Sequence, residues 1–338
     1  MKIESGSELY KSQAQTILEI FDDIFSPEKE YQLSCTIKIT PDIRRDIYLL
    51  SSEKEKKHFD SFGVPDFNGF LIQPSSDDLA FTILIAEKQF ADSQYVHTLI
   101  HELVHLHDYF RYYKEHGNLN IKSPAEQDKY FFREFYYWSE FHAKRTGNLI
   151  FAIYRYRVEY NLEAPPDGKY SFAIDFQTKG LEESLDRFLS NNSPERRNDL
   201  FWDFVYTLIG YYGRLSIAAS EDPAAIPDPS FPRDKIHKAF GKAAIELFPL
   251  LKSMDSYEKA LASWPSLKSL FDQIINNLNY DLSPWSIFEA NLRDQLSTLH
   301  NQIQNLAQSL NQMTSISSFL KKESNISPSS ERDGNKPR

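Results

Sequence analysis

The chain has 338 residues, of which 41% are hydrophobic and 14% aromatic, and its formal net charge is −10. This apolar content suffices for a sizeable core spread over two subdomains and excludes a wholly disordered chain. The acidic balance argues against a general nucleic-acid surface, and the single cysteine, Cys35, excludes an internal disulfide.

No segment of the sequence is typical of a secretion signal or a membrane span. Residues 1–25 lack the basic stretch and apolar core of a Sec-type signal, and no run of about 18 apolar residues occurs. We therefore expect a cytoplasmic protein whose partners include neither a membrane nor a nucleic acid. Export by another kind of signal is the alternative.

The first 90 residues predict one helix and several short strands. Residues 9–25 place their apolar side chains on one side, and Ser7 is a suitable N-cap. Apolar–polar alternation, and apolar runs bounded by turn residues, predict β-strands. These strands are expected at 33–40, 46–50, 69–73 and 81–86.

The stretch His101-Glu102-Leu103-Val104-His105 follows these strands. On a helix, His101 and His105 lie one turn apart on one face, so both imidazoles can bind a single metal ion. Glu102 lies about 100° further around, where it can take a proton from a metal-bound water. Apolar residues at helical spacing predict that the motif lies on an amphipathic helix ending near Gly117. The alternative is a helix whose histidines only face solvent or the core.

A catalytic zinc site has three protein ligands and one open position, so a third ligand is needed. A second helix is predicted from Ser123, which begins a capping box, to Gly147. It carries Glu140, 35 residues after His105, far enough for the second helix to fold back beside the first. Apolar neighbours would bury Glu140, and a buried carboxylate needs a partner such as a metal ion. The alternative is a surface glutamate paired with Lys144 one turn later.

Together, the stretches from His101 to Asp108 and from Ser139 to Ala143 resemble the gluzincin branch of zinc metallopeptidases. Among these they are most similar to the group related to anthrax lethal factor, which combines H-E-x-x-H-x-x-D with a downstream E-F-x-A. The resemblance covers residues 65–150. It implies a zincin-like fold, with Glu102 as the general base and with zinc ligands His101, His105 and Glu140.

Two positions depart from the pattern of the lethal factor relatives. Lys144 stands where they usually carry a second acid, and Arg133 stands where they carry a tyrosine seven residues before the ligand glutamate. The sequence therefore does not identify the residue that donates a hydrogen bond to the oxyanion. Asp108 can orient a ligand imidazole, whereas His97 is expected at the surface. The tyrosines that can either serve as the donor or only pack are Tyr136, Tyr137, Tyr211 and Tyr212.

After residue 150 the chain reads as mainly helical. Gly210 and Gly213 permit close packing of one helix against another, or a kink. A heptad seam from Leu292 to Met313 either docks on this helical half or mediates self-association or binding of a partner helix. A short strand is expected at 170–174, and helices are expected at 193–219, 233–249 and 255–279.

The sequence thus predicts an α+β fold with three parts. Residues 1–150 form a zincin-like catalytic domain with a small mixed sheet, an active-site helix and a Glu-bearing helix. Residues 151–321 form a helical domain, and residues 322–338 a disordered tail. The expected function is zinc-dependent hydrolysis of peptide bonds in a peptide or protein substrate, by an endopeptidase rather than an exopeptidase. The alternative is a catalytically silent zincin-like domain that binds a protein partner.

Overall fold

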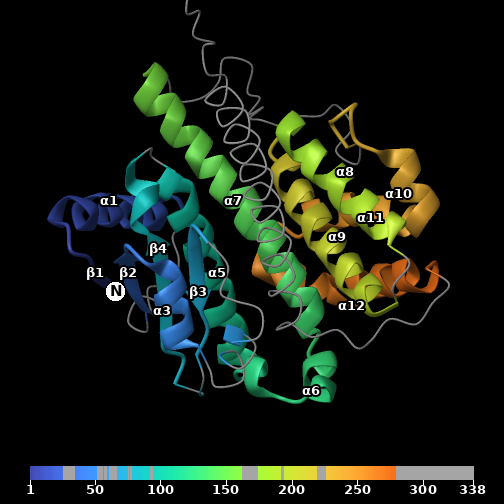
Figure 1. Ribbon diagram of the computed structural model, residues 1–338, viewed down its shortest axis with the longest axis horizontal. Helices are drawn as coiled ribbons and strands as arrows, with labels where there is room; N and C mark the ends of the chain where they lie inside the picture. The colour runs from blue at the N-terminus through green and yellow to red at the C-terminus, as the bar shows by residue number, and fades with distance from the viewer. Residues whose placement is uncertain are drawn as a thin grey trace, which may run out of the picture. The chain divides into compact units, whose positions relative to one another are not determined.

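The chain forms a mixed α+β structure, mostly helical with a small mixed sheet, which confirms the α+β class and the small mixed sheet (Figure 1). The expected seam at 292–313 and the tail at 322–338 lie outside the described residues. The computed structural model describes residues 1–25, 35–51, 56, 59–60, 67–74, 76, 78–91, 94–161, 174–191, 194–218 and 226–278.

The sheet of the described residues has four strands in the order β1-β2-β4-β3. β1 (Lys2–Glu4), β2 (Cys35–Thr40) and β4 (Phe81–Ala86) run parallel to one another. β3 (Gly69–Ile72) pairs with β4 in the antiparallel direction and is the edge strand next to it. The strands predicted at 33–40, 69–73 and 81–86 are therefore present, although β3 ends one residue early and residues 33–34 lie outside the described residues.

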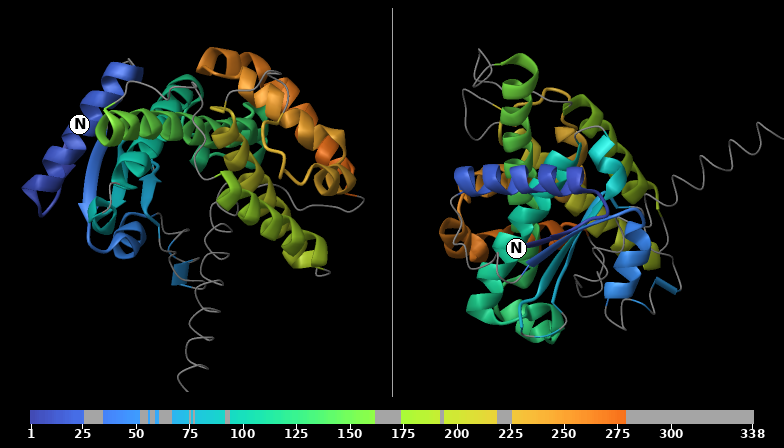
Figure 2. Two further views of the ribbon diagram at one scale, coloured as in Figure 1. Left: turned by 90° about the horizontal axis from the view of Figure 1, so that it is seen from above. Right: turned by 90° about the vertical axis from the view of Figure 1, so that its left-hand side faces the viewer.

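Different helices cover the two faces of the sheet. α1 (Glu8–Phe25) and α5 (Gln94–His116) pack on the face where Ile37 and Ile83 are fully buried. α3 (Ile43–Leu50) packs on the opposite face, and the strands run between α1 and α3 in the right-hand view of Figure 2. The helix predicted at 9–25 is confirmed by α1.

The prediction of a strand at 46–50 was wrong, because these residues belong to α3. The side chain of Asp42 accepts a hydrogen bond from a backbone amide of the first turn, which caps the helix. Ile43 and Ile47 lie one turn apart, and both are buried against Leu84 of the sheet. The four-residue spacing of these two side chains suits a helix. The apolar residues of the sequence alone did not distinguish a helix from a strand.

The second predicted helix, at 123–147, is present as two helices. α6 (Pro124–Lys129) begins with the expected capping box, in which Ser123 and Glu126 bond each other's backbone amides. α7 (Phe132–Tyr160) follows after Phe131, whose φ of 59° is left-handed. α7 packs along α5 and crosses residue 150, the expected domain boundary, without a break.

The remaining helices complete one continuous core with α1, α5 and α7. The helix predicted at 233–249 is divided at Gly241, whose φ of +74° suits a residue without a side chain. Among the described residues, no helix is long and apolar enough to cross a membrane. Short 3-10 turns occupy Glu87–Ala91 and Leu119–Ile121, and the further helices are α8 (Ile174–Ser190), α9 (Pro194–Leu215), α10 (Arg233–Phe240), α11 (Lys242–Ser253) and α12 (Tyr257–Asn276).

Candidate metal centre

α5 and α7 bring together the three residues that the sequence nominated as metal ligands. His101 and His105 lie one turn apart on α5, with their Nε2 atoms 3.2 Å from each other. Oε2 of Glu140, on α7, lies 3.2 Å from Nε2 of His105 and 3.8 Å from Nε2 of His101. The three ligand atoms all lie within 4.8 Å of one another, so the group can hold a metal ion.

The chemistry of this donor set fits a divalent cation. Without an ion, one of the two facing imidazole nitrogens must carry a proton, whereas a cation accepts both lone pairs. Zinc bonds of about 2.0–2.1 Å in tetrahedral geometry place two ligand nitrogens about 3.3 Å apart, close to the 3.2 Å observed. Burial and the nearby Lys144 ammonium hold the pKa of His101 well below its usual range, which keeps this imidazole neutral.

Glu140 is buried as its neighbours predicted, because Phe135, Trp138 and Phe141 are fully inaccessible around it. Burial opposes its ionisation, but the Lys144 ammonium and the two imidazoles outweigh burial and hold its pKa well below the usual range. Glu140 is therefore a charged carboxylate in the interior.

Glu140 is buried as expected and not at the surface, yet it also forms the predicted ion pair with Lys144. Its Oε2 faces the histidines, while Nζ of Lys144 lies 3.3 Å from its Oε1. With one oxygen held by a cation, the carboxylate presents the other oxygen to the metal position. Lys144 therefore orients the third ligand from the side away from the histidines.

Glu102 lies where α5 meets β3. Its carboxylate accepts a backbone hydrogen bond from Leu71, and the missing side chain of Gly69 makes room for it. A Cβ at Gly69 would lie 2.5 Å from Cγ2 of Thr98 and 3.2 Å from Cγ of Glu102. Burial raises the pKa of Glu102 to about 7, although the neighbouring His105 opposes this rise. Glu102 is thus a carboxylate able to hold or release a proton near neutrality.

Behind the metal group lies a polar network that the sequence revealed only in part. Oγ of Ser139 lies 2.9 Å from Nδ1 of His105 and donates to Asp108 over 3.2 Å. Since the Ser139 proton points at Asp108, Nδ1 of His105 must donate, which leaves its Nε2 free to bind a metal. Asp108 therefore orients His105 through Ser139, and His142 Nδ1 lies 3.0 Å from the same carboxylate.

Ser139 and His142 were not singled out from the sequence. The available signal was their position on the helical face next to Glu140, combined with Asp108 three residues after His105. That signal identifies a network only once α5 and α7 are known to lie side by side, as Figure 1 shows.

His97 is half-buried rather than exposed, and it is not part of the metal group. Its ring stacks on His101 with the centroids 6.1 Å apart, and its Nε2 is buried with no hydrogen-bond partner. Burial lowers the pKa of His97 to about 3, so its imidazole is neutral. It is a neutral neighbour of a ligand histidine.

Two of the tyrosines considered as oxyanion donors use their hydroxyl groups elsewhere, and the other two pack by their rings. Tyr211 donates its hydroxyl hydrogen bond to Asp228, and Tyr212 donates to the carbonyl of Ala244 at 3.0 Å. The ring of Tyr137 is fully buried and stacks on Trp202. Tyr136 is also buried, and its ring lies 5.1 Å from that of Tyr137.

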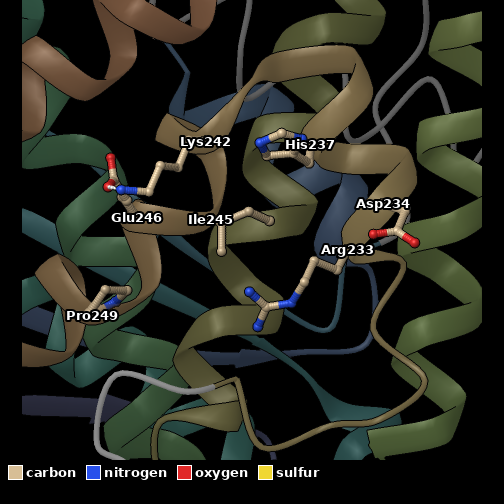
Figure 3. A pocket seen from close by; sticks show the side chains of 7 residues that line it. All are labelled: Arg233, Asp234, His237, Lys242, Ile245, Glu246 and Pro249. Atoms are coloured by element: carbon tan, nitrogen blue, oxygen red, sulfur yellow. Dashed lines mark ion pairs between the residues drawn. The ribbon is translucent and has the colours of Figure 1, made fainter.

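A hollow of about 370 Å³ opens between α10 and α11 (Figure 3). Its charges are partly compensated, since Nζ of Lys242 lies 2.6 Å from Glu246. The lining residues are Arg233, Asp234, His237, Lys242, Ile245, Glu246 and Pro249. The metal group and this hollow therefore share no residue.

Comparison with protein-family models, with curated proteins and with solved structures finds no match for this chain. Its function is therefore inferred from its own residues.

Proposed function

We propose that this chain is a zinc-dependent metallopeptidase of the gluzincin type with a zincin-like catalytic fold. In this proposal His101, His105 and Glu140 bind Zn²⁺, and Glu102 is the general base. The observation that supports it best is the convergence of three ligand atoms within 4.8 Å on two packed helices. Two histidines and one glutamate are the ligands of a known class of catalytic zinc site that keeps a fourth position open.

Glu102 supplies the acid–base chemistry in this proposal. Bound zinc supplies Lewis acidity, which brings the pKa of a coordinated water near ~7. Glu102, held by the Leu71 amide, takes the proton of the attacking water and returns it to the leaving amine. Burial of the Glu102 side chain favours its protonated form, which helps it to hold the proton between the two steps.

β3 supports a preference for extended peptides, and hence endopeptidase activity. It is one of the two edge strands of the described sheet, and its Gly69 lies directly beside Glu102. An edge strand can add a peptide substrate by backbone hydrogen bonding, which aligns the scissile bond along the strand. Recognition of this kind does not depend on a free terminus of the substrate.

Metal analysis combined with cleavage of a peptide library tests the proposal. The purified protein should bind one equivalent of zinc and cleave a subset of the library, and His101→Ala should abolish both. Failure to bind zinc would contradict the proposal. One equivalent of zinc without any cleavage would instead favour the silent zincin-like binding domain.

A further inference from the structure

Lys144 is a cation held against the ligand carboxylate where α7 and α9 cross. Its Nζ lies 3.3 Å from Oε1 of Glu140, and its side chain is only 19% exposed. A Cβ at Gly213 would lie 2.7 Å from Cβ of Lys144, and a Cβ at Gly210 would lie 3.7 Å from its Cε. The aliphatic chain of Lys144 therefore packs along these two glycines of α9, and its ammonium is directed to the carboxylate.

The two oxygens of Glu140 have different surroundings. Oε2 lies 3.2 Å from Nε2 of His105 and 3.8 Å from Nε2 of His101, whereas Oε1 lies beside the ammonium. Oε1 is buried and has no hydrogen-bond partner among the described residues, so the ammonium of Lys144 compensates its charge. The carboxylate thus faces the metal position with one oxygen.

Binding of a metal ion through both oxygens would require Oε1 to leave this ammonium. Among the described residues, Glu140 is the one acid paired with Lys144, so the ammonium would stay half-buried without an acid. Separation of a buried pair is unfavourable, because the charge that remains is neither fully hydrated nor paired. Zn²⁺ in a four-coordinate site needs only one oxygen and avoids this cost. Harder ions such as Mn²⁺ prefer more oxygen ligands and do not avoid it.

We propose that Lys144 is a positioning residue that limits Glu140 to one metal-bound oxygen and thereby raises the preference of the site for Zn²⁺ over Mn²⁺. This inference rests on the metal site of the proposed function, but not on peptide cleavage. Divalent ions generally bind in an order that places Zn²⁺ above Mn²⁺, and Lys144 widens that difference. The helical half of the chain contributes to the metal centre in this way, because α9 holds Lys144 in place.

Metal affinities of a variant without the charge test the inference. Lys144→Met keeps an unbranched side chain for the contact with α9 and removes the ammonium. Dissociation constants for Zn²⁺ and Mn²⁺, measured by competition with a chromogenic chelator, should show that the ratio favouring Zn²⁺ falls about tenfold in the variant. Lys144→Arg retains a cation and should keep most of the parental ratio.

Substitution with Co²⁺ supplies a readout that a purely structural role of Lys144 would not change. Four-coordinate Co²⁺ absorbs visible light more strongly than five- or six-coordinate Co²⁺, so the spectrum reports the coordination number. The Co²⁺ form of the parent should absorb strongly. That of Lys144→Met should absorb more weakly, because the second oxygen of Glu140 then reaches the ion.

Lys242→Met is the matched control. It also removes a lysine paired with a glutamate four residues away, since Nζ of Lys242 lies 2.6 Å from Oε1 of Glu246. The Lys242 side chain is 78% exposed on α11 and is not part of the metal group. Both the affinity ratio and the Co²⁺ spectrum of this variant should equal those of the parent.

An unchanged affinity ratio or an unchanged Co²⁺ spectrum in Lys144→Met would overturn the inference and leave the zinc proposal intact. An equal loss of affinity for both ions is one such result, and it would show that Lys144 only supports the site as a whole. Lys144→Gln provides the same test if Lys144→Met does not fold. A weakly absorbing Co²⁺ form of the parent would overturn the inference without any variant.

The same measurements separate this inference from the proposed function. Failure of the parent to bind Zn²⁺ would overturn the metal site, and the inference with it. Zinc binding without peptide cleavage, together with the predicted change in Lys144→Met, would overturn only the peptidase proposal and would support the role of Lys144.

Discussion

Ser139 is the residue through which Asp108 acts on the candidate metal centre. It accepts from the imidazole of His105 and donates to the carboxylate, so it fixes both the tautomer and the orientation of that ring. Such a partner lowers the free-energy cost of orienting the His105 imidazole before a metal binds. The Ser139 side chain is not one of the three candidate ligands, so its removal tests only the orientation of His105.

Replacing Ser139 by alanine should weaken zinc binding by about 10- to 100-fold, the usual effect of losing an outer partner of a ligand imidazole. Competition with a chromogenic chelator measures this affinity. Ser253→Ala is the control, because that exposed hydroxyl only donates to Leu250 in its own helix, at 2.6 Å. If Ser139→Ala binds zinc as the parent does, His105 does not depend on the network.

At the scale of elements, the close contact between β3 and α5 requires a glycine at position 69. The Cβ of an alanine at Gly69 would clash with Cγ2 of Thr98, at 2.5 Å, and press on Glu102. Gly69→Ala should therefore lower both the melting temperature and the rate of cleavage. Thr98→Ser removes the clashing methyl group, so the double variant should recover most of both properties. A double variant as impaired as Gly69→Ala would show that this contact is not the cause.

The crossing of α7 and α9 depends on Gly213 in the same way. Its added Cβ would meet the backbone of Phe141, which cannot rotate away, and we expect Gly213→Ala to cost about 1–3 kcal/mol of unfolding free energy. Gly180 on α8 has nothing within 4 Å, so Gly180→Ala should instead stabilise the protein by up to about 1 kcal/mol. Denaturant unfolding measures both, and changes of the same sign would contradict this account of the crossing.

Local signals in the sequence predicted the elements that carry the candidate site. The helical spacing around His101, the cap at Ser123 and the apolar run of 81–86 each specify structure within a few residues, and each element is present. Glu140 was found because its burial follows from its own helix.

The features that the sequence did not reveal depend on contacts between distant segments. The side chains of Ile43 and Ile47 suit a short strand or a helix until they pack on the sheet. The left-handed turn at Phe131 has no glycine to signal it. Ser139 became recognisable as a partner of His105 only once α7 was seen to pack along α5.

At the scale of the whole molecule, stability in acid should depend on buried carboxylates outside the metal group. Asp228 accepts hydrogen bonds from Thr178 of α8, from Tyr211 of α9 and from the nearby Ser230. Burial opposes its ionisation, but the bonds from Tyr211 and Ser230 outweigh burial and hold the pKa of Asp228 below its usual range. The carboxylate thus links two helices to the loop before α10.

Because the folded pKa of Asp228 is below its unfolded value of about 3.9, this stabilisation is complete above that pH. It is lost as the pH falls through the folded pKa. Asp228→Asn should cost about 1–3 kcal/mol at neutral pH and should flatten the fall in melting temperature below about pH 4. Asp186→Asn, at an exposed position, is the control. If the melting temperature of Asp228→Asn falls with pH as that of the parent does, Asp228 does not determine stability in acid.

The measurement that tests the central claim most directly compares Glu102→Gln with the parent for zinc content and for peptide cleavage. The amide keeps the shape of the side chain between β3 and α5 and leaves all three ligands in place. It removes only the base that accepts the proton of the attacking water. The account predicts one equivalent of zinc in both proteins, and cleavage slower by at least ~10²-fold in the variant. Cleavage at the parental rate would contradict it.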